Sequence, residues 1–374
     1  MLLPRTARLA AWLGVTFFSA VSLVAEPALS RVEEPADLAA APLTVGGRVV
    51  ATAAAAGTSY RFQWPGISFD AAFTGQRAYV QIGEGNAIYH LIVDGRPIVK
   101  LTKPTAGWYE LAGLPPGRHT VRVEVASENQ GGAAVFGGLW VPRGTKTERP
   151  SRSSRQIEFI GDSHTVGYGN TSTTRECSGD GVWLTTDTSQ AFGPLTAKHY
   201  GADYRIHAIS GRGIVRNYNG GGGEPLPKAY PFALFDRQTP ADDAGWHPQV
   251  IVIGLGTNDF TTPLNPGEKW QTRDELHADY ERTYVAFVQQ LRARHPQAFF
   301  LLTATDMAEG EIQAEVKKVV AQLEASGEKR LAFIAYNQLE LTACDWHPSL
   351  ADHRFMSAAV RSFLDARPEV WQGK

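Results

Sequence analysis

Between residues 43 and 141, hydrophobic and polar residues alternate in short runs that are separated by turn residues. Alternation with a period of two predicts β-strands with one buried face and one exposed face. Asp94-Gly95, placed between two apolar runs, is typical of a two-residue hairpin turn. Because no helical period occurs in this part of the sequence, we expect a β-sandwich over residues 43–150. The clearest of the predicted strands are 67–73, 78–82, 89–93 and 119–125.

The pattern changes after a polar segment, 142–155, that is rich in Arg, Ser and Thr and is expected to be a linker. Short apolar runs then alternate with longer segments of helical period. This order predicts a parallel sheet covered by helices on both faces, over residues 151–374. The expected strands are 157–160, 204–209, 249–255, 298–303 and 331–335, and the expected helices are 189–200, 274–294, 310–326 and 349–366.

The first residues are typical of an export signal, because Arg5 and Arg8 precede an apolar run from residue 9 to residue 24. We assign residues 1–25 to this signal, which predicts a secreted or periplasmic protein with no membrane contact after cleavage. An uncleaved membrane anchor is the alternative, since the run is close to spanning length. The Ala-, Pro- and Glu-rich segment 26–42 is expected to be a flexible leader.

Charge and cysteine content narrow the class of protein. Removal of Arg5 and Arg8 with the signal takes the formal charge from −2 to −4, and no basic run is present, so nucleic acid is not an expected partner. Cys177 and Cys344 are the two cysteines of the chain. In an oxidising compartment they are a reasonable disulfide, with two buried thiols as the alternative.

Four polar patches follow predicted strands or precede the last helix, and each could supply one part of a serine esterase site. Gly161-Asp162-Ser163-His164 offers Ser163 as the nucleophile, and Asp345-Trp346-His347 offers His347 as the base. The N–H groups of Ser163 and Gly211 and the amide of Asn258 would hold the oxyanion. Because carboxyl ends of parallel strands lie at one edge of the sheet, three of the patches should meet there.

Two aspartates beside these residues have different expected roles. Asp162 is expected to be structural, accepting hydrogen bonds that hold the loop of Ser163. The second N–H of His347 needs an acceptor, and Asp345 is the natural candidate. A backbone carbonyl could also serve, and the sequence leaves this choice open.

Metal and cofactor chemistry are not required by the sequence. The remaining histidines show no metal-ligand spacing, and there is no phosphate loop or dinucleotide fingerprint. We therefore expect an enzyme without a cofactor or a bound metal.

The patches resemble the four blocks of the SGNH (GDSL-like) hydrolase superfamily, with His164 where the name-giving pattern has leucine. Residues 161–170, 210–214 and 344–349 are similar to carbohydrate esterase family 2. That resemblance implies a jelly-roll β-sandwich before a three-layer α/β/α hydrolase domain, and removal of O-acetyl groups from xylan or glucomannan. It also implies Ser163 and His347 as the catalytic pair, with Gly211 and Asn258 in the oxyanion hole. The spacing Asp-x-His departs from the usual Asp-x-x-His, which puts the role of Asp345 in question.

Tyr168, Trp183 and Trp346 are candidate substrate-binding residues, because aromatic faces stack against sugar rings. Ordinary packing within loops is the alternative for all three.

The leading hypothesis is an exported esterase that deacetylates polysaccharide or oligosaccharide through an acetyl-serine intermediate. Two other classes remain open. One is a carbohydrate-binding protein with a silent hydrolase domain, against which the complete set of Ser163, Asn258 and His347 argues. The other is an esterase or thioesterase for lipid acyl chains.

Overall fold

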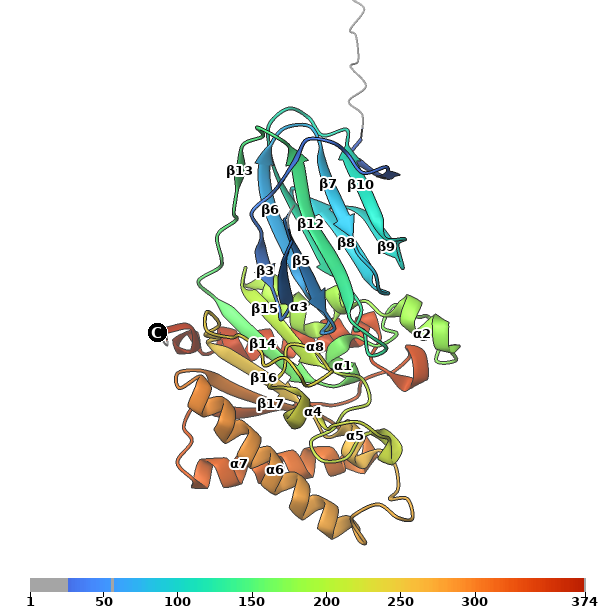
Figure 1. Cartoon of the computed structure of the whole chain (residues 1–374). Helices are drawn as coiled ribbons and strands as arrows, with labels where there is room; N and C mark the ends of the chain where they lie inside the picture. Colours follow the sequence, from blue (N-terminus) through green and yellow to red (C-terminus); the bar gives the residue numbers. More distant parts are fainter. Residues whose placement is uncertain (1–25, 55–56, 373–374) are drawn as a thin grey trace, which may run out of the picture.

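The computed structural model describes residues 26–54 and 57–372, so the predicted export signal lies outside the described residues. Figure 1 shows a β-sandwich, in blue to green, stacked on an α/β domain that runs from green to red. The expected antiparallel sandwich followed by a parallel sheet with helices is confirmed.

The sandwich consists of two antiparallel sheets whose inner faces form a core. The first sheet contains, in order, β1 (Ala28–Val32), β10 (Gly107–Ala112), β7 (Ala78–Ile82), β12 (Ala134–Pro142), β5 (Gly57–Phe62) and β4 (Val50–Ala54), with β2 (Leu38–Ala40) also beside β12. The second contains β13 (Thr147–Glu148), β6 (Ser68–Thr74), β11 (Arg118–Val125), β8 (Ile88–Val93) and β9 (Arg96–Thr102), with β3 (Thr44–Gly46) also beside β6. Asp94 and Gly95 form the expected β8–β9 turn, and both have the positive φ that such a hairpin requires.

The prediction of a flexible leader over residues 26–42 is wrong. Strand β1 pairs with β10, with Ala28 opposite Ala112, and β2 pairs with β12. The strands of this segment are short and have no buried face, so their sequence shows no alternation of hydrophobic and polar residues. Main-chain hydrogen bonds to strands distant in sequence hold them in place. The predicted linker 142–155 likewise contains β13, which pairs with β6.

The second domain has a parallel sheet in the order β15 (Asp203–Ala208), β14 (Gln156–Gly161), β16 (Val250–Gly254), β17 (Phe299–Thr305) and β18 (Leu331–Tyr336). One face is covered by α3 (Phe192–His199) and α8 (Leu350–Asp365), which pack together. The other is covered by α6 (Arg273–Arg294) and α7 (Glu311–Ala325). The apolar stripe of α8, which includes Met356, Val360 and Leu364, is fully buried against the sheet.

Short helices occupy the loops at the carboxyl ends of these strands. They are α1 (Ser163–Val166), α2 (Gly179–Thr185), η1 (Thr188–Gln190), η2 (Tyr218–Gly220), α4 (Leu226–Ala229), α5 (Thr257–Phe260), η3 (Ala308–Gly310) and η4 (Cys344–Trp346), and η5 (Pro368–Gln372) lies near the end of the chain. In the described part of the chain no helix has both the length and the apolar character needed to cross a membrane.

Charged side chains join the two domains. Arg48 of the sandwich, 3% exposed, binds Asp243 of the second domain at 2.7 Å. Glu124 of β11 binds Lys198 of α3 at 3.1 Å, and Glu124 is also buried. Buried charges are tolerated when they are paired in this way, so the polar interface fixes the sandwich against the second domain.

Candidate active site

The predicted nucleophile, Ser163, lies where the central strand β14 ends and α1 begins. Asp162 is the N-cap of α1, and its carboxylate accepts from the His164 N–H at 3.0 Å. Gly161 permits this sharp turn, because a Cβ there would lie 2.0 Å from the Thr165 hydroxyl and 3.0 Å from the Gly254 carbonyl. The turn therefore needs glycine for close packing, and it presents Ser163 at the edge of the sheet.

The structure brings Ser163 and His347 together across 184 residues of sequence. The distance from His347 Nε2 to Ser163 Oγ is 2.8 Å. The other ring nitrogen, Nδ1, lies 3.0 Å from the carbonyl oxygens of Cys344 and Asp345. A carbonyl can only accept, so Nδ1 carries the hydrogen and Nε2 is left to accept from the hydroxyl. This geometry is that of a serine and its general base.

The side chain of Asp345 does not orient the imidazole as predicted. Its carboxylate instead accepts from the Tyr168 hydroxyl at 3.0 Å. Asp345 and Trp346 both have left-handed backbones, with φ of 51° and 57°. This conformation turns main-chain carbonyls toward Nδ1 and sends the carboxylate elsewhere, so the acceptor is the backbone, which the sequence had left as the alternative.

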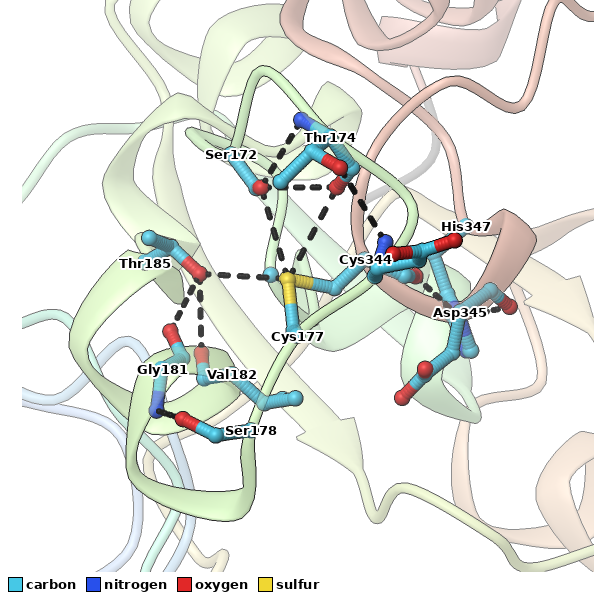
Figure 2. The surroundings of a disulfide bond; sticks show 12 residues. Ser172, Thr174, Cys177, Ser178, Gly181, Val182, Thr185, Cys344, Asp345 and His347 are labelled. Carbon is cyan, nitrogen blue, oxygen red and sulfur yellow. Dashed lines mark hydrogen bonds between the residues drawn. A yellow bond between two sulfur atoms is a disulfide. The ribbon is translucent and has the colours of Figure 1, made fainter.

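The segment that carries His347 is held at both ends. Cys344, directly before Asp345, forms a disulfide with Cys177, and the predicted pairing is confirmed (Figure 2). Arg175, two residues before Cys177, accepts from the Asp345 N–H at 2.8 Å through its carbonyl. Its guanidinium donates to the Leu341 and Glu340 carbonyls at 2.8 and 2.9 Å.

On the other side of His347, Ser349 and Asp352 form a capping box that begins α8. Asp352 also accepts from the N–H groups of Glu340 and Leu341 at 2.8 and 3.1 Å. One buried carboxylate thus fixes the beginning and the end of the histidine loop. The spacing Ser-x-x-Asp before an apolar run could have identified Asp352 from the sequence.

Two aromatic rings enclose the imidazole. The Tyr168 ring lies 4.3 Å from that of His347, and the buried His164 ring meets it edge-on at 5.4 Å. Burial lowers the pKa of His347 below its ordinary value of 6.5, because the charged imidazolium is poorly solvated here. The imidazole is therefore neutral, and able to accept a proton, over a wider range of pH than an exposed histidine.

The loop after β15 carries Gly211, which has a φ of 81°. In the described part of the structure, no acceptor is found for the N–H groups of Gly211 and Ser163. Both can therefore donate to an incoming oxygen.

This loop is held by a residue that the sequence did not indicate, Glu128 of the β-sandwich. Its carboxylate accepts from the Ser210 N–H at 2.9 Å, and Gln130 donates to the Ser210 carbonyl at 3.0 Å. Nothing in the sequence links Glu128 to Ser210, which lies 82 residues further along the chain.

Asn258 lies on α5, directly after β16, as predicted. Its amide nitrogen donates to the Arg212 carbonyl at 2.9 Å and to Asp162 Oδ2 at 3.2 Å. It therefore links the loop of Gly211 to the loop of Ser163, and Asp162 has the structural role expected of it. Burial, together with the nearby Asp259, raises the pKa of Asp162 to about 7.

Asp259, which sequence reasoning missed, holds the loop that carries Gly211. It is fully buried and accepts from three consecutive N–H groups, those of Ile214, Val215 and Arg216, at 2.9 to 3.0 Å. Its position directly after Asn258 in a strand-ending Gly-Thr-Asn-Asp turn was the available sign.

The three predicted aromatic residues lie in different places. Tyr168 contacts His347, whereas Trp346 is 59% exposed beside the site, with the Arg175 guanidinium 6.0 Å from its ring. Trp183 lies farther away, on α2, in a cleft that Tyr168 also lines.

Comparison with known proteins shows the family of the chain. Residues 159–355 match the family described as GDSL-like Lipase/Acylhydrolase, and residues 45–150 match the Carbohydrate esterase 2 N-terminal domain. The chain belongs to carbohydrate esterase family 2, within the GDSL-like hydrolases.

Among its relatives is an acetylxylan esterase / glucomannan deacetylase of Cellvibrio japonicus (strain Ueda107). The two are 43% identical over 332 residues, which are 88% of this chain and 92% of the relative. A solved structure described as a carbohydrate esterase whose active site "displays divergent catalytic and non-catalytic binding functions" is 42% identical, with a TM-score of 0.84 over 89% of this chain and 99% of that one. A family two carbohydrate esterase from Clostridium thermocellum, in complex with cellohexaose, is 26% identical, with a TM-score of 0.78 over 88% and 100%.

Proposed function

We propose that this chain is an exported serine esterase that removes O-acetyl groups from polysaccharide of the xylan or glucomannan type. The observation that carries the proposal is the 2.8 Å contact between Ser163 Oγ and His347 Nε2. The activity printed for the Cellvibrio japonicus relative supports the choice of substrate. The disulfide and the export signal predicted from the sequence support an extracellular or periplasmic location.

In the first half of the reaction, Ser163 Oγ attacks the acetyl carbonyl carbon while His347 Nε2 takes the hydroxyl proton. The main-chain carbonyls at Nδ1 stabilise the imidazolium that results. The negative charge on the acetyl oxygen is held by the N–H groups of Ser163 and Gly211. The bond to the sugar oxygen then breaks, and His347 returns the proton to that oxygen.

In the second half, His347 takes a proton from water, and the hydroxide attacks the acetyl-serine. Acetate leaves, and the proton returns to Ser163 Oγ. Asn258 is the third proposed oxyanion donor. Its longer contact, at 3.2 Å to Asp162, is the one that an oxyanion would share.

The proposal can be tested by trapping the intermediate. Rapid acid quenching during hydrolysis of p-nitrophenyl acetate should give a peptide acetylated at Ser163 in a mass spectrum. Acetylation at a different residue, or none under conditions of turnover, would contradict it. Parallel assays with p-nitrophenyl octanoate separate this function from that of a lipid esterase, which would prefer the longer chain.

A further inference from the structure

A cleft of about 570 Å³ opens between the two domains beside the active site. One wall consists of β-sandwich residues 85–86 and 128–133, and the other of hydrolase residues 179–180, 182–183 and 186. A hydrogen bond from Lys100 on β9 to the Leu184 carbonyl on α2, at 3.4 Å, holds the walls together. The volume is in the range that small-molecule ligands occupy in proteins.

One end of the cleft reaches the catalytic groups. Tyr168 lines the cleft and also lies 4.3 Å from the His347 ring. Glu128 and Gln130 line it as well, and both bind Ser210, the neighbour of Gly211. A molecule in the cleft would therefore extend directly from a group held between His347 and Gly211.

The lining matches a polyhydroxylated ligand. Asn129 lines the cleft and is 6% exposed, and its side-chain nitrogen has no hydrogen-bond partner among the described residues. A buried donor without a partner is costly, and a ligand hydroxyl would satisfy it. Trp183 adds an aromatic surface of the kind that stacks against sugar rings.

The charged groups that line the cleft have partners, and part of its wall is bare backbone. Lys103 lies 3.7 Å from Asp180, so this cation is paired. The carboxylate of Glu128, which also lines the cleft, accepts from the Ser210 N–H, so this anion has a partner as well. At Gly131 and Gly132, the position that a Cβ would occupy has no neighbouring atom within 4 Å, which leaves open space at the sandwich wall. A neutral polymer fits this environment better than an ionic one.

We infer that this cleft binds the neutral glycan backbone on one side of the acetylated sugar, so that the β-sandwich forms part of the substrate-binding site. The inference rests on the proposed function and specifies how its polymeric substrate is held.

The test is binding of soluble, unacetylated glucomannan to the full chain, measured by isothermal titration calorimetry. Gly132→Phe should block the cleft, because Gly132 does not have a left-handed backbone and has room for a side chain. Trp183→Ala removes the aromatic surface. Trp270→Ala is the matched control. The ammonium of Lys269 lies 4.5 Å from the centre of the Trp270 ring, and that of Lys103 lies 4.7 Å from the centre of the Trp183 ring. Trp270, however, lies outside the cleft.

We expect Gly132→Phe and Trp183→Ala to weaken binding at least tenfold, and Trp270→Ala to retain the wild-type dissociation constant. Equal affinity for wild type and Gly132→Phe, or no binding by the wild type, would overturn the inference. If Trp183→Ala does not fold, Gly132→Phe decides. Because the ligand carries no acetyl group, the outcome is distinct from that of the esterase proposal, which fails if the wild type releases no acetate.

Discussion

Glu128 provides a test of whether the β-sandwich positions the oxyanion loop. Glu128→Ala removes the acceptor of the Ser210 N–H, which lies 2.9 Å from the carboxylate and directly precedes Gly211. Loss of a hydrogen bond to a charged group costs about 1.5 to 3 kcal/mol. Complete loss of an oxyanion donor raises the activation barrier by about 2.7 to 4 kcal/mol, and this value is the upper limit for the effect of Glu128→Ala.

We therefore expect the barrier to rise by about 2 kcal/mol in Glu128→Ala, which corresponds to about a thirtyfold lower kcat. The KM for p-nitrophenyl acetate should change little, because the loop acts on the transition state more than on the bound ester. Glu128→Gln retains an acceptor oxygen and should recover most of the rate.

A second carboxylate separates this effect from simple loosening of the domain interface. Glu124 lies on β11, the strand that precedes Glu128 in the chain. It also reaches the hydrolase domain, but it binds Lys198 on α3. Glu124→Ala should lower the unfolding temperature without a comparable loss of kcat. The reasoning is refuted if folded Glu128→Ala retains the wild-type kcat, or if Glu124→Ala loses as much.

Three further outcomes are expected. Asp345→Asn should lower kcat by less than about tenfold, because backbone carbonyls orient His347. Replacement of the aspartate in a Ser-His-Asp triad lowers kcat by roughly 10⁴-fold, and a loss of that size here would contradict the geometry. In a pH profile of kcat/KM, activity should fall on the acidic side with a midpoint below pH 6.5, because protonation of His347 abolishes the base and burial lowers its pKa. Asp162, whose pKa is raised to about 7, could produce a separate loss of activity, which Asp162→Asn would remove. A midpoint above pH 6.5 that persists in Asp162→Asn would count against the assignment to His347. Replacement of both Cys177 and Cys344 by serine should lower the free energy of unfolding in urea by up to about 5 kcal/mol, because the disulfide joins residues 167 positions apart. The same replacement should also lower kcat. An unchanged urea midpoint would be the contrary result.

Much of the active site was predictable because its parts follow strands of a parallel sheet. Ser163, Gly211 and Asn258 each come directly after a buried apolar run, and sheet geometry then places them at one edge. The disulfide was predictable because Cys177 and Cys344 each flank a patch of the same site.

Other features depend on contacts that no local pattern encodes. The acceptor at His347 Nδ1 depends on the left-handed backbone of Asp345, whose N–H is bound by the carbonyl of Arg175. Glu128 binds Ser210 across the domain interface, and β1 is held by pairing with β10, which lies far along the chain. In each case a partner distant in sequence selects the conformation, which composition and periodicity cannot reveal.

The central claim is that Ser163 and His347 act together as nucleophile and base. Its most direct test is the rate of acetate release from acetylated glucomannan by Ser163→Ala, compared with wild type at equal folded concentration. The account predicts that the variant retains the fold and the thermal unfolding of the wild type but releases acetate at least about 10³-fold more slowly. Acetate release at the wild-type rate by the folded variant would contradict it.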